Sequence, residues 1–207
     1  MNSGTSKAIG AIAFVVGFVA VKYALQLYRE HSVVAAAEQS IAQTTQQGVE
    51  KHPDLQVSEA VQLEAVAAAS RAIKVANDDR TSIATAASTF IGFYLVNDRE
   101  RPRFCRELGV DISSFVSPFE REHQAELTKA RTVLSAIPDA SEERLYALLQ
   151  PQLRKVIDQD MKDISTKSST SLKGACEVVA AGGAAIAEKM QISKIQPDVY
   201  AALMNSK

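Results

Sequence analysis

The chain has 207 residues and a formal net charge of −1, with 46% hydrophobic and 23% charged residues. This is the composition of an ordinary folded protein, which excludes a collagen-like or wholly disordered chain, and the near-neutral charge argues against a nucleic-acid partner. Two cysteines are too few for a disulfide-rich scaffold or a four-thiolate zinc site.

The first element is an apolar run close to the N-terminus. Every residue from 8 to 21 is uncharged, but a bilayer-spanning helix needs roughly 20 apolar residues. Lys22 can extend its ammonium group to the lipid headgroups, and apolar residues continue to Tyr28. We therefore predict one lipid-contacting transmembrane helix over residues 8–28, with membrane-anchor residues that include Ala8, Phe14, Gly17, Val21, Tyr23 and Tyr28.

Two other interpretations of this run stay open. A cleaved signal peptide also has a short apolar run, but the nearest small residues suited to cleavage, 34–37, lie beyond several charged residues. A helix buried in the core is also compatible with a run this short. We adopt the uncleaved anchor.

The orientation and self-association of the anchor rest on fewer residues. Lys7 and the α-amine lie on the N-terminal side of the apolar run, and Lys22 and Arg29 lie on its C-terminal side, so positive charge favours neither side. The short N-terminal tail leads us to predict that the body lies on the extracytoplasmic (periplasmic) side. Gly10 and Gly17 share one helix face, on which self-association of two spans is possible.

The rest of the chain shows helical periodicity and no hairpin signal. Residues 29–53 are polar and Gln-rich, which indicates a juxtamembrane stalk or connector. We predict an all-α fold in three parts. Residues 1–28 form the tail and a single N-terminal transmembrane helix, residues 29–53 form the connector, and residues 54–207 form a compact bundle of five to seven helices.

Within the bundle, the first two helices are predicted at 55–76 and 80–96. The second is apolar on most faces, which is typical of a central helix covered by others. The charged stretch 97–102, NDRERP, predicts a break, and a short segment at 103–109 follows it.

The N-termini of the later helices can be recognised from capping motifs in the sequence. Ser117-Pro118-Phe119-Glu120 matches a capping box with proline at the first helical position, so a helix is predicted from Ser117 to Ile137. A second box near Ser141 opens an apolar stripe that reaches residue 164, and Pro151 marks either a kink or a junction of two helices. The last helices are predicted at 172–190 and 197–204.

Few residues suggest a catalytic or metal-binding site. Glu120-x-x-His123 has the spacing of a metal-binding pair, but a di-metal bundle needs two such pairs, and Glu120 has a competing role in the cap. The pair is a weak metal candidate, and a core histidine is the simpler interpretation. Asp158, Asp160 and Asp163 lack the glycine and distal glutamate of a calcium loop, so we expect a solvated helix face. No cofactor is indicated.

Cys105 and Cys176 leave two alternatives open. If the body is extracytoplasmic, a disulfide can join the segment 103–109 to the helix at 172–190. Otherwise the two residues are separate buried thiols. Gly182-Gly183 has no strand before it and no phosphate-loop lysine after it, so close helix packing or a local helix break explains this pair.

The sequence leaves two possible functions, which belong to different functional classes. The first is a non-enzymatic, membrane-anchored helical module for protein–protein interaction or envelope assembly, because an anchored body without a reactive motif acts most simply by its position. The alternative is a helical-bundle enzyme or small-ligand-binding domain, with a site built from distant residues around His123. The sequence leaves enzymatic activity uncertain and favours its absence.

Overall fold

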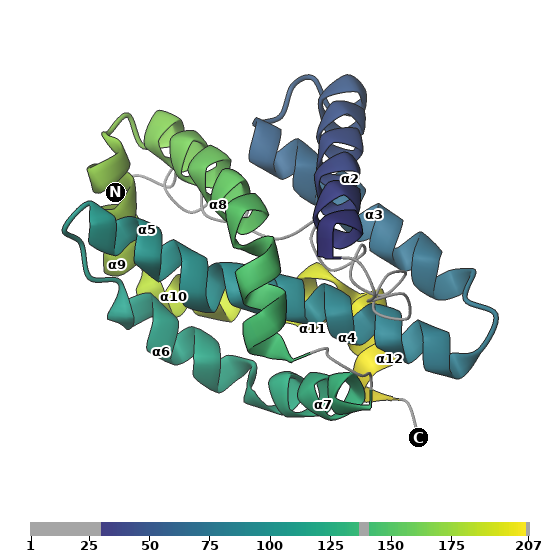
Figure 1. Ribbon diagram of the computed structural model, residues 1–207. Helices are drawn as coiled ribbons and strands as arrows, with labels where there is room; N and C mark the ends of the chain where they lie inside the picture. The colour runs from purple at the N-terminus through teal and green to yellow at the C-terminus, as the bar shows by residue number, and fades with distance from the viewer. Residues whose placement is uncertain (1–29, 137–140, 206–207) are drawn as a thin grey trace.

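A computed structural model describes the backbone of residues 30–136 and 141–205, and side chains from residue 38 onward (Figure 1). The predicted anchor, residues 8–28, lies outside this part of the chain. In the described ranges no helix is both long and apolar enough to cross a bilayer. All regular structure there is helical, which confirms the all-α class: α2 Glu30–Lys51, α3 Val57–Lys74, α4 Asp79–Leu95, the π-helical turn η2 Val96–Glu100, α5 Arg101–Glu107, α6 Ser113–Glu122, α7 Gln124–Ser135, α8 Glu142–Lys167, α9 Leu172–Ala181, α10 Gly183–Lys189, α11 Ile192–Ile195 and α12 Pro197–Met204.

Helix α4 lies at the centre of the bundle, as its all-round apolar sequence predicts. It packs against α3, α7, α8 and α12, and every residue from 85 to 95 is buried (Figure 1). Its buried hydroxyls bond to carbonyl oxygens of the same helix: Thr85 Oγ1 donates to Thr81 O, and Thr89 Oγ1 donates to Thr85 O. The helix therefore satisfies these polar groups itself while it serves as the core.

The described part of the bundle contains more helices than the five to seven predicted, because two expected helices are divided and the short helix α11 was not expected. The expected helix at 117–137 is broken at His123 into α6 and α7, and the expected helix at 172–190 is broken at Gly182 into α9 and α10. By contrast, α8 is a single helix that contains Pro151, so the sequence is not divided into two helices there. Figure 1 shows that α8 changes direction about midway along its length. The connector residues form α2, which packs on α3 and α8.

The break predicted at 97–102 is wrong. The chain passes from α4 through η2 into α5 without leaving helical geometry, and the extra residue of the π-turn is accommodated within the helix. Pro102 lies at the start of α5, directly after the π-turn, and has no amide hydrogen to donate to the preceding turn.

The predicted start at Ser117 is also wrong, because α6 begins at Ser113 and Pro118 lies inside it. Asp111 provides the cap, since its carboxylate accepts hydrogen bonds from Ser113 N at 2.9 Å and from Ser113 Oγ at 2.9 Å. Pro118 has no amide hydrogen to donate to the carbonyl of Ser114, one turn earlier.

Gly183 packs against this same carbonyl. A Cβ at residue 183 would lie 2.3 Å from Ser114 O, 2.4 Å from Ser114 C and 2.6 Å from Phe115 N. Helices α10 and α6 therefore approach each other backbone to backbone. The close approach of the two helices explains why residue 183 is a glycine, and the end of α9 lies at Gly182. Both explanations that the sequence suggested for the glycine pair therefore apply.

We expect Gly183→Ala to lower the free energy of unfolding by about 3 kcal/mol, because the methyl group meets main-chain atoms that cannot rotate away. Gly182→Ala is the matched control: its Cβ would meet mainly the flexible side chain of Ile186, at 3.0 Å. Urea denaturation of both variants checks this. Equal loss of stability in the two would contradict the close-approach argument.

Candidate functional site: the buried polar cluster at the π-turn

The π-turn places polar side chains in the interior of the bundle. Asn97, Glu100 and Arg101 are each fully buried, although their sequence resembles a solvated loop. Asn97 Nδ2 donates to Phe93 O at 3.0 Å, and Arg101 Nε donates to Asn97 Oδ1 at 3.1 Å. Because π-bulges in helices are often found at functional positions, this buried polar cluster is the candidate functional site.

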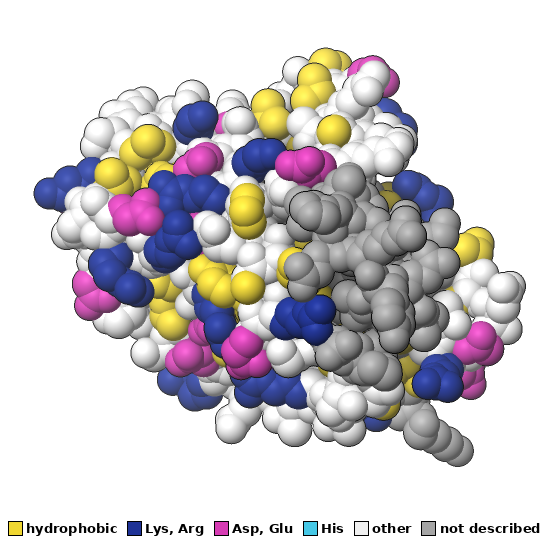
Figure 2. Space-filling view, viewed as in Figure 1, with side chains coloured by type: hydrophobic (Ala, Val, Ile, Leu, Met, Phe, Trp, Pro, Cys, Tyr) yellow, Lys and Arg dark blue, Asp and Glu magenta, His cyan; other side chains and the backbone are white. Residues whose placement is uncertain are grey.

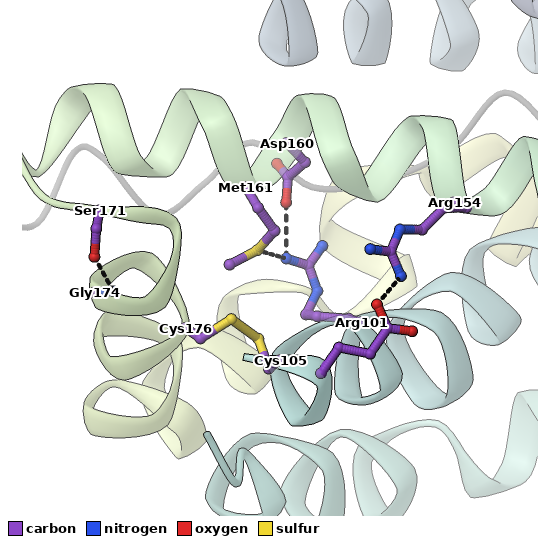
Figure 3. Close-up of a disulfide and its surroundings, with 9 residues drawn as sticks. Arg101, Cys105, Arg154, Asp160, Met161, Ser171, Gly174 and Cys176 are labelled. Atoms are coloured by element: carbon purple, nitrogen blue, oxygen red, sulfur yellow. Dashed lines mark hydrogen bonds and ion pairs between the residues drawn. A yellow bond between two sulfur atoms is a disulfide. The ribbon is translucent and has the colours of Figure 1, made fainter. Parts of the chain in front are cut away.

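Arg101 forms the centre of the cluster. Its Nη1 donates to Asp160 Oδ2 on α8 at 2.7 Å and lies 3.4 Å from the sulfur of Met161 (Figure 3). Its Nη2 and the second oxygen of Asp160 have no hydrogen-bond partner, although both are buried. Burial raises the pKa of Asp160 to about 6, and the guanidinium of Arg101 opposes this shift.

Glu100 forms a second buried contact with α8. Its carboxylate accepts from the hydroxyl of Tyr146 at 2.9 Å, and the guanidinium groups of Arg103 and Arg154 lie 3.6 Å and 3.8 Å away. Arg154, labelled in Figure 3, also bonds to Glu107 at 2.7 Å. Carboxylates and guanidinium groups therefore alternate between α5 and α8.

The carboxyl group of Asp98 interacts with a second carboxyl group, that of Glu120. Burial, together with the charge of Glu120 and its hydrogen bond to Asp98, raises the pKa of Asp98 to about 6. Two carboxyl groups bond to each other only while they share a proton. This pair can hold one proton between η2 and α6, close to neutral pH.

The Asp98–Glu120 pair predicts a pH dependence of stability. The unfolded chain titrates Asp98 near pH 3.8 and the folded chain near 6, so the folded state holds an extra proton between these values. The stabilisation is complete below about pH 4 and is lost as the pH rises through 6. We expect Asp98→Asn to be more stable than the wild type by about 1 kcal/mol at pH 7.5, because partial exposure reduces the effect.

Thermal unfolding of the wild type and Asp98→Asn between pH 4 and 8 measures this effect. The difference should shrink as the pH falls toward 4. Glu177→Gln, which removes an exposed carboxylate on α9, is the control. A difference that does not change with pH would show that the two carboxyl groups do not share a proton.

The two cysteines are joined beside the cluster. Cys105 Sγ and Cys176 Sγ form a disulfide that links α5 to α9, with 5.5 Å between the Cα atoms (Figure 3). Both residues are fully buried. Of the alternatives left open by the sequence, the structure therefore contains the disulfide, one helical turn after Arg101.

The structure separates the roles of Glu120 and His123. Glu120 is exposed and its carboxyl meets Asp98, whereas His123 is buried among Phe90, Phe93 and Phe119. Nδ1 of His123 lies 2.8 Å from Phe119 O, and Nε2 lies 3.2 Å from Met190 O. Burial lowers the pKa of this imidazole. A neutral imidazole donates through one nitrogen only, so one of the two carbonyl oxygens accepts a hydrogen bond from it. Burial among aromatic rings is typical of a core histidine.

The aspartates on α8 differ from the solvated face that we expected. Asp160 and Asp163 are buried, and Asp163 Oδ2 accepts from Ser58 N on α3 at 2.7 Å. Asp158 bonds to Arg154 at 3.0 Å. Each carboxylate has a partner because α8 is covered on more than one side. No group of three His, Cys, Asp or Glu residues in the described ranges could hold a metal ion.

A surface depression of about 390 Å³ lies where α5 meets the start of α6. Its lining includes Arg106 and Asp111, but the Asp111 carboxylate already caps α6 through Ser113. The polar cluster is consistent with a structural network, since most of its charged groups meet an opposite charge inside the bundle. Figure 2 likewise shows Lys and Arg side chains interspersed with Asp and Glu on the face in view.

Sequence reasoning missed Asn97, Glu100 and Arg101. One signal could have identified two of them: Phe93, Asn97, Arg101 and Cys105 recur at intervals of four and continue the buried face of α4. Comparison of the chain with protein-family models, with curated proteins and with solved structures gives no match.

Proposed function

We propose that this protein is a membrane-anchored, non-enzymatic helical module that binds a protein partner on the extracytoplasmic side. The observation that carries the proposal is where apolar side chains are exposed. The large hydrophobic residues exposed in the described ranges all lie on α2, α3 or the segments next to them, with exposed fractions of 43%, 37%, 48% and 75% for Val49, Leu55, Leu63 and Val75.

Three of these residues belong to one end of the α2–α3 hairpin. Val49 lies in the last turn of α2, Leu55 in the connection, and Leu63 in the first half of α3. Figure 2 shows hydrophobic side chains gathered at this end of the hairpin. We call Val49, Leu55 and Leu63 the apolar tip. Exposed apolar groups that cluster on an otherwise polar surface are typical of protein-binding sites.

Two further features support the membrane-anchored, extracytoplasmic part of the proposal. The uncharged run of residues 8–21 is suited to lipid. The disulfide between Cys105 and Cys176 is of a kind that persists in oxidising compartments and is rare in reducing ones. Together they favour a body that has crossed the membrane and stays attached to it.

Affinity purification of the detergent-solubilised full chain tests partner binding. The variant Val49→Ser/Leu55→Ser/Leu63→Ser should lose a partner that the wild type retains. Val75→Ser is the matched control, because it removes a still more exposed valine at the far end of α3. An unchanged set of bound proteins would overturn the role of the apolar tip, and a bound small molecule would favour the ligand-binding alternative.

Fractionation tests the anchor separately. The full chain should sediment with membranes, and the chain without residues 1–28 should be soluble and helical. Protease added to intact and to broken cells then reports the side on which the body lies. Full-length protein recovered in the soluble fraction without detergent would contradict the anchor.

A further inference from the structure

The side chains of the α2–α3 hairpin that the structure describes, from residue 38 onward, contribute little to the main core. The large buried side chains of the central cluster come from α4 to α12, whereas α3 contributes Ala69, and Ile41 and Ile73 pack against the cluster only partly buried. Burial of alanine removes far less apolar surface from water than burial of phenylalanine or leucine. The hydrophobic attraction between the bundle and the described side chains of α2–α3 is therefore small compared with that inside the bundle.

The hairpin is held together by contacts of its own. Gly48 lets α2 approach α3 closely, because a Cβ there would lie 2.8 Å from the main-chain carbon and oxygen of Ala60. Lys51 at the end of α2 donates to Glu64 of α3 at 2.7 Å, and Glu64 is buried. Ala60 and Ala65 are buried but lie outside the central cluster. The two helices thus form a unit with an interface of small residues and one ion pair.

Several polar contacts join this unit to the bundle. Asp163 of α8 accepts from the amide of Ser58 at 2.7 Å, and Lys167 of α8 pairs with Glu59. Glu38 of α2 accepts from Gln152 at 3.1 Å and from Lys155 at 3.4 Å. At the other end of α3, Lys74 pairs with Asp198 of α12 at 2.9 Å.

Two properties weaken this attachment. The Glu38–Lys155 and Lys74–Asp198 pairs are between 40% and 68% exposed, so dissolved salt screens them. The side-chain oxygen of Gln152 is buried without a partner in the docked state. A buried acceptor that lacks a donor favours separation, since water can bond to it once the hairpin moves away.

From these contacts we infer that the α2–α3 hairpin is a separable arm: it undocks from α4, α8 and α12 as a unit while the rest of the bundle stays folded. The arm connects residues 1–29 to the bundle and carries the apolar tip. Undocking therefore changes how the apolar tip is placed relative to the bundle. This inference does not depend on the proposed partner.

Hydrogen exchange of the full chain in detergent, followed by mass spectrometry, tests the inference. As NaCl is raised from low to molar concentration, we expect amides of α2 and α3 to exchange faster, while amides of α4 and α8 keep their protection. The variant Glu38→Gln, at an exposed position, should accelerate exchange in the arm about fivefold at low salt, the effect of removing a weak surface contact.

Arg121→Gln is the control for the change in charge, because Arg121 lies on α6, away from the contacts described, and is largely exposed. It should leave exchange in the arm unaltered. Lys167→Gln provides a second test at a more buried contact. The inference is overturned if α2, α3, α4 and α8 lose protection together and by the same factor, or if salt and Glu38→Gln leave the arm unaffected.

Discussion

Arg101→Met is expected to lower the free energy of unfolding by about 3–5 kcal/mol, the range for removing one partner of a buried ion pair. The loss of attraction is only part of this cost. Asp160, 97% buried, would keep its carboxylate in the interior without the guanidinium that faces it at 2.7 Å. Asn97 Oδ1 would also lose its donor. Chemical denaturation by urea measures the effect.

The double variant Arg101→Met/Asp160→Leu separates the two causes. An apolar pair of similar volume removes the uncompensated charge, so the double variant should recover most of the stability lost by Arg101→Met. If the losses of the two single variants instead add up in the double variant, Arg101 and Asp160 are not energetically coupled, and an uncompensated charge does not explain the cost of Arg101→Met. The existing unpaired atoms, Arg101 Nη2 and Asp160 Oδ1, argue for recovery.

Cys105→Ser/Cys176→Ser is expected to cost about 4 kcal/mol, because the disulfide closes a long loop and restricts the unfolded chain. The side chains are also fully buried, so each serine places a hydroxyl where no partner is provided. Reduction with a dithiol under mild denaturation should shift the wild-type transition by a similar amount and leave the double variant unchanged.

Mass spectrometry after alkylation of non-reduced protein gives an independent check of the disulfide. Protein recovered from its cellular location should carry no alkyl group at Cys105 or Cys176 until a reductant is added. Two freely alkylated thiols in that protein would remove both the disulfide and the support that it gives to an extracytoplasmic body.

Periodicity predicted the elements whose structure depends on local sequence. Helix α4 was expected at 80–96 and runs from Asp79 to Leu95, and α12 begins at Pro197 as the proline predicts. Asp78 explains the first boundary, since its carboxylate accepts from Thr81 N at 2.7 Å. Helix caps and apolar stripes depend on residues that are close together in the sequence, so the sequence alone suffices to predict them.

The π-turn could not be predicted in the same way. Asn97, Glu100 and Arg101 are stabilised inside the bundle by partners far along the chain, such as Tyr146 and Asp160. A charged stretch without those partners would be solvated, which is how the sequence was interpreted. The start of α6 was missed for a similar reason: Ser117 and Glu120 match a capping box, but Asp111 caps the helix earlier, and α10 packs where Pro118 leaves the backbone open.

The enclosed position of the Cys105–Cys176 disulfide has a consequence for the order of assembly. Neither sulfur is accessible once α9 has packed against α6 and α8, so a thiol oxidant must act before that packing is complete. During synthesis the segment with Cys105 emerges first and stays reduced until the later cysteine arrives. The last third of the chain therefore decides when the bond can form.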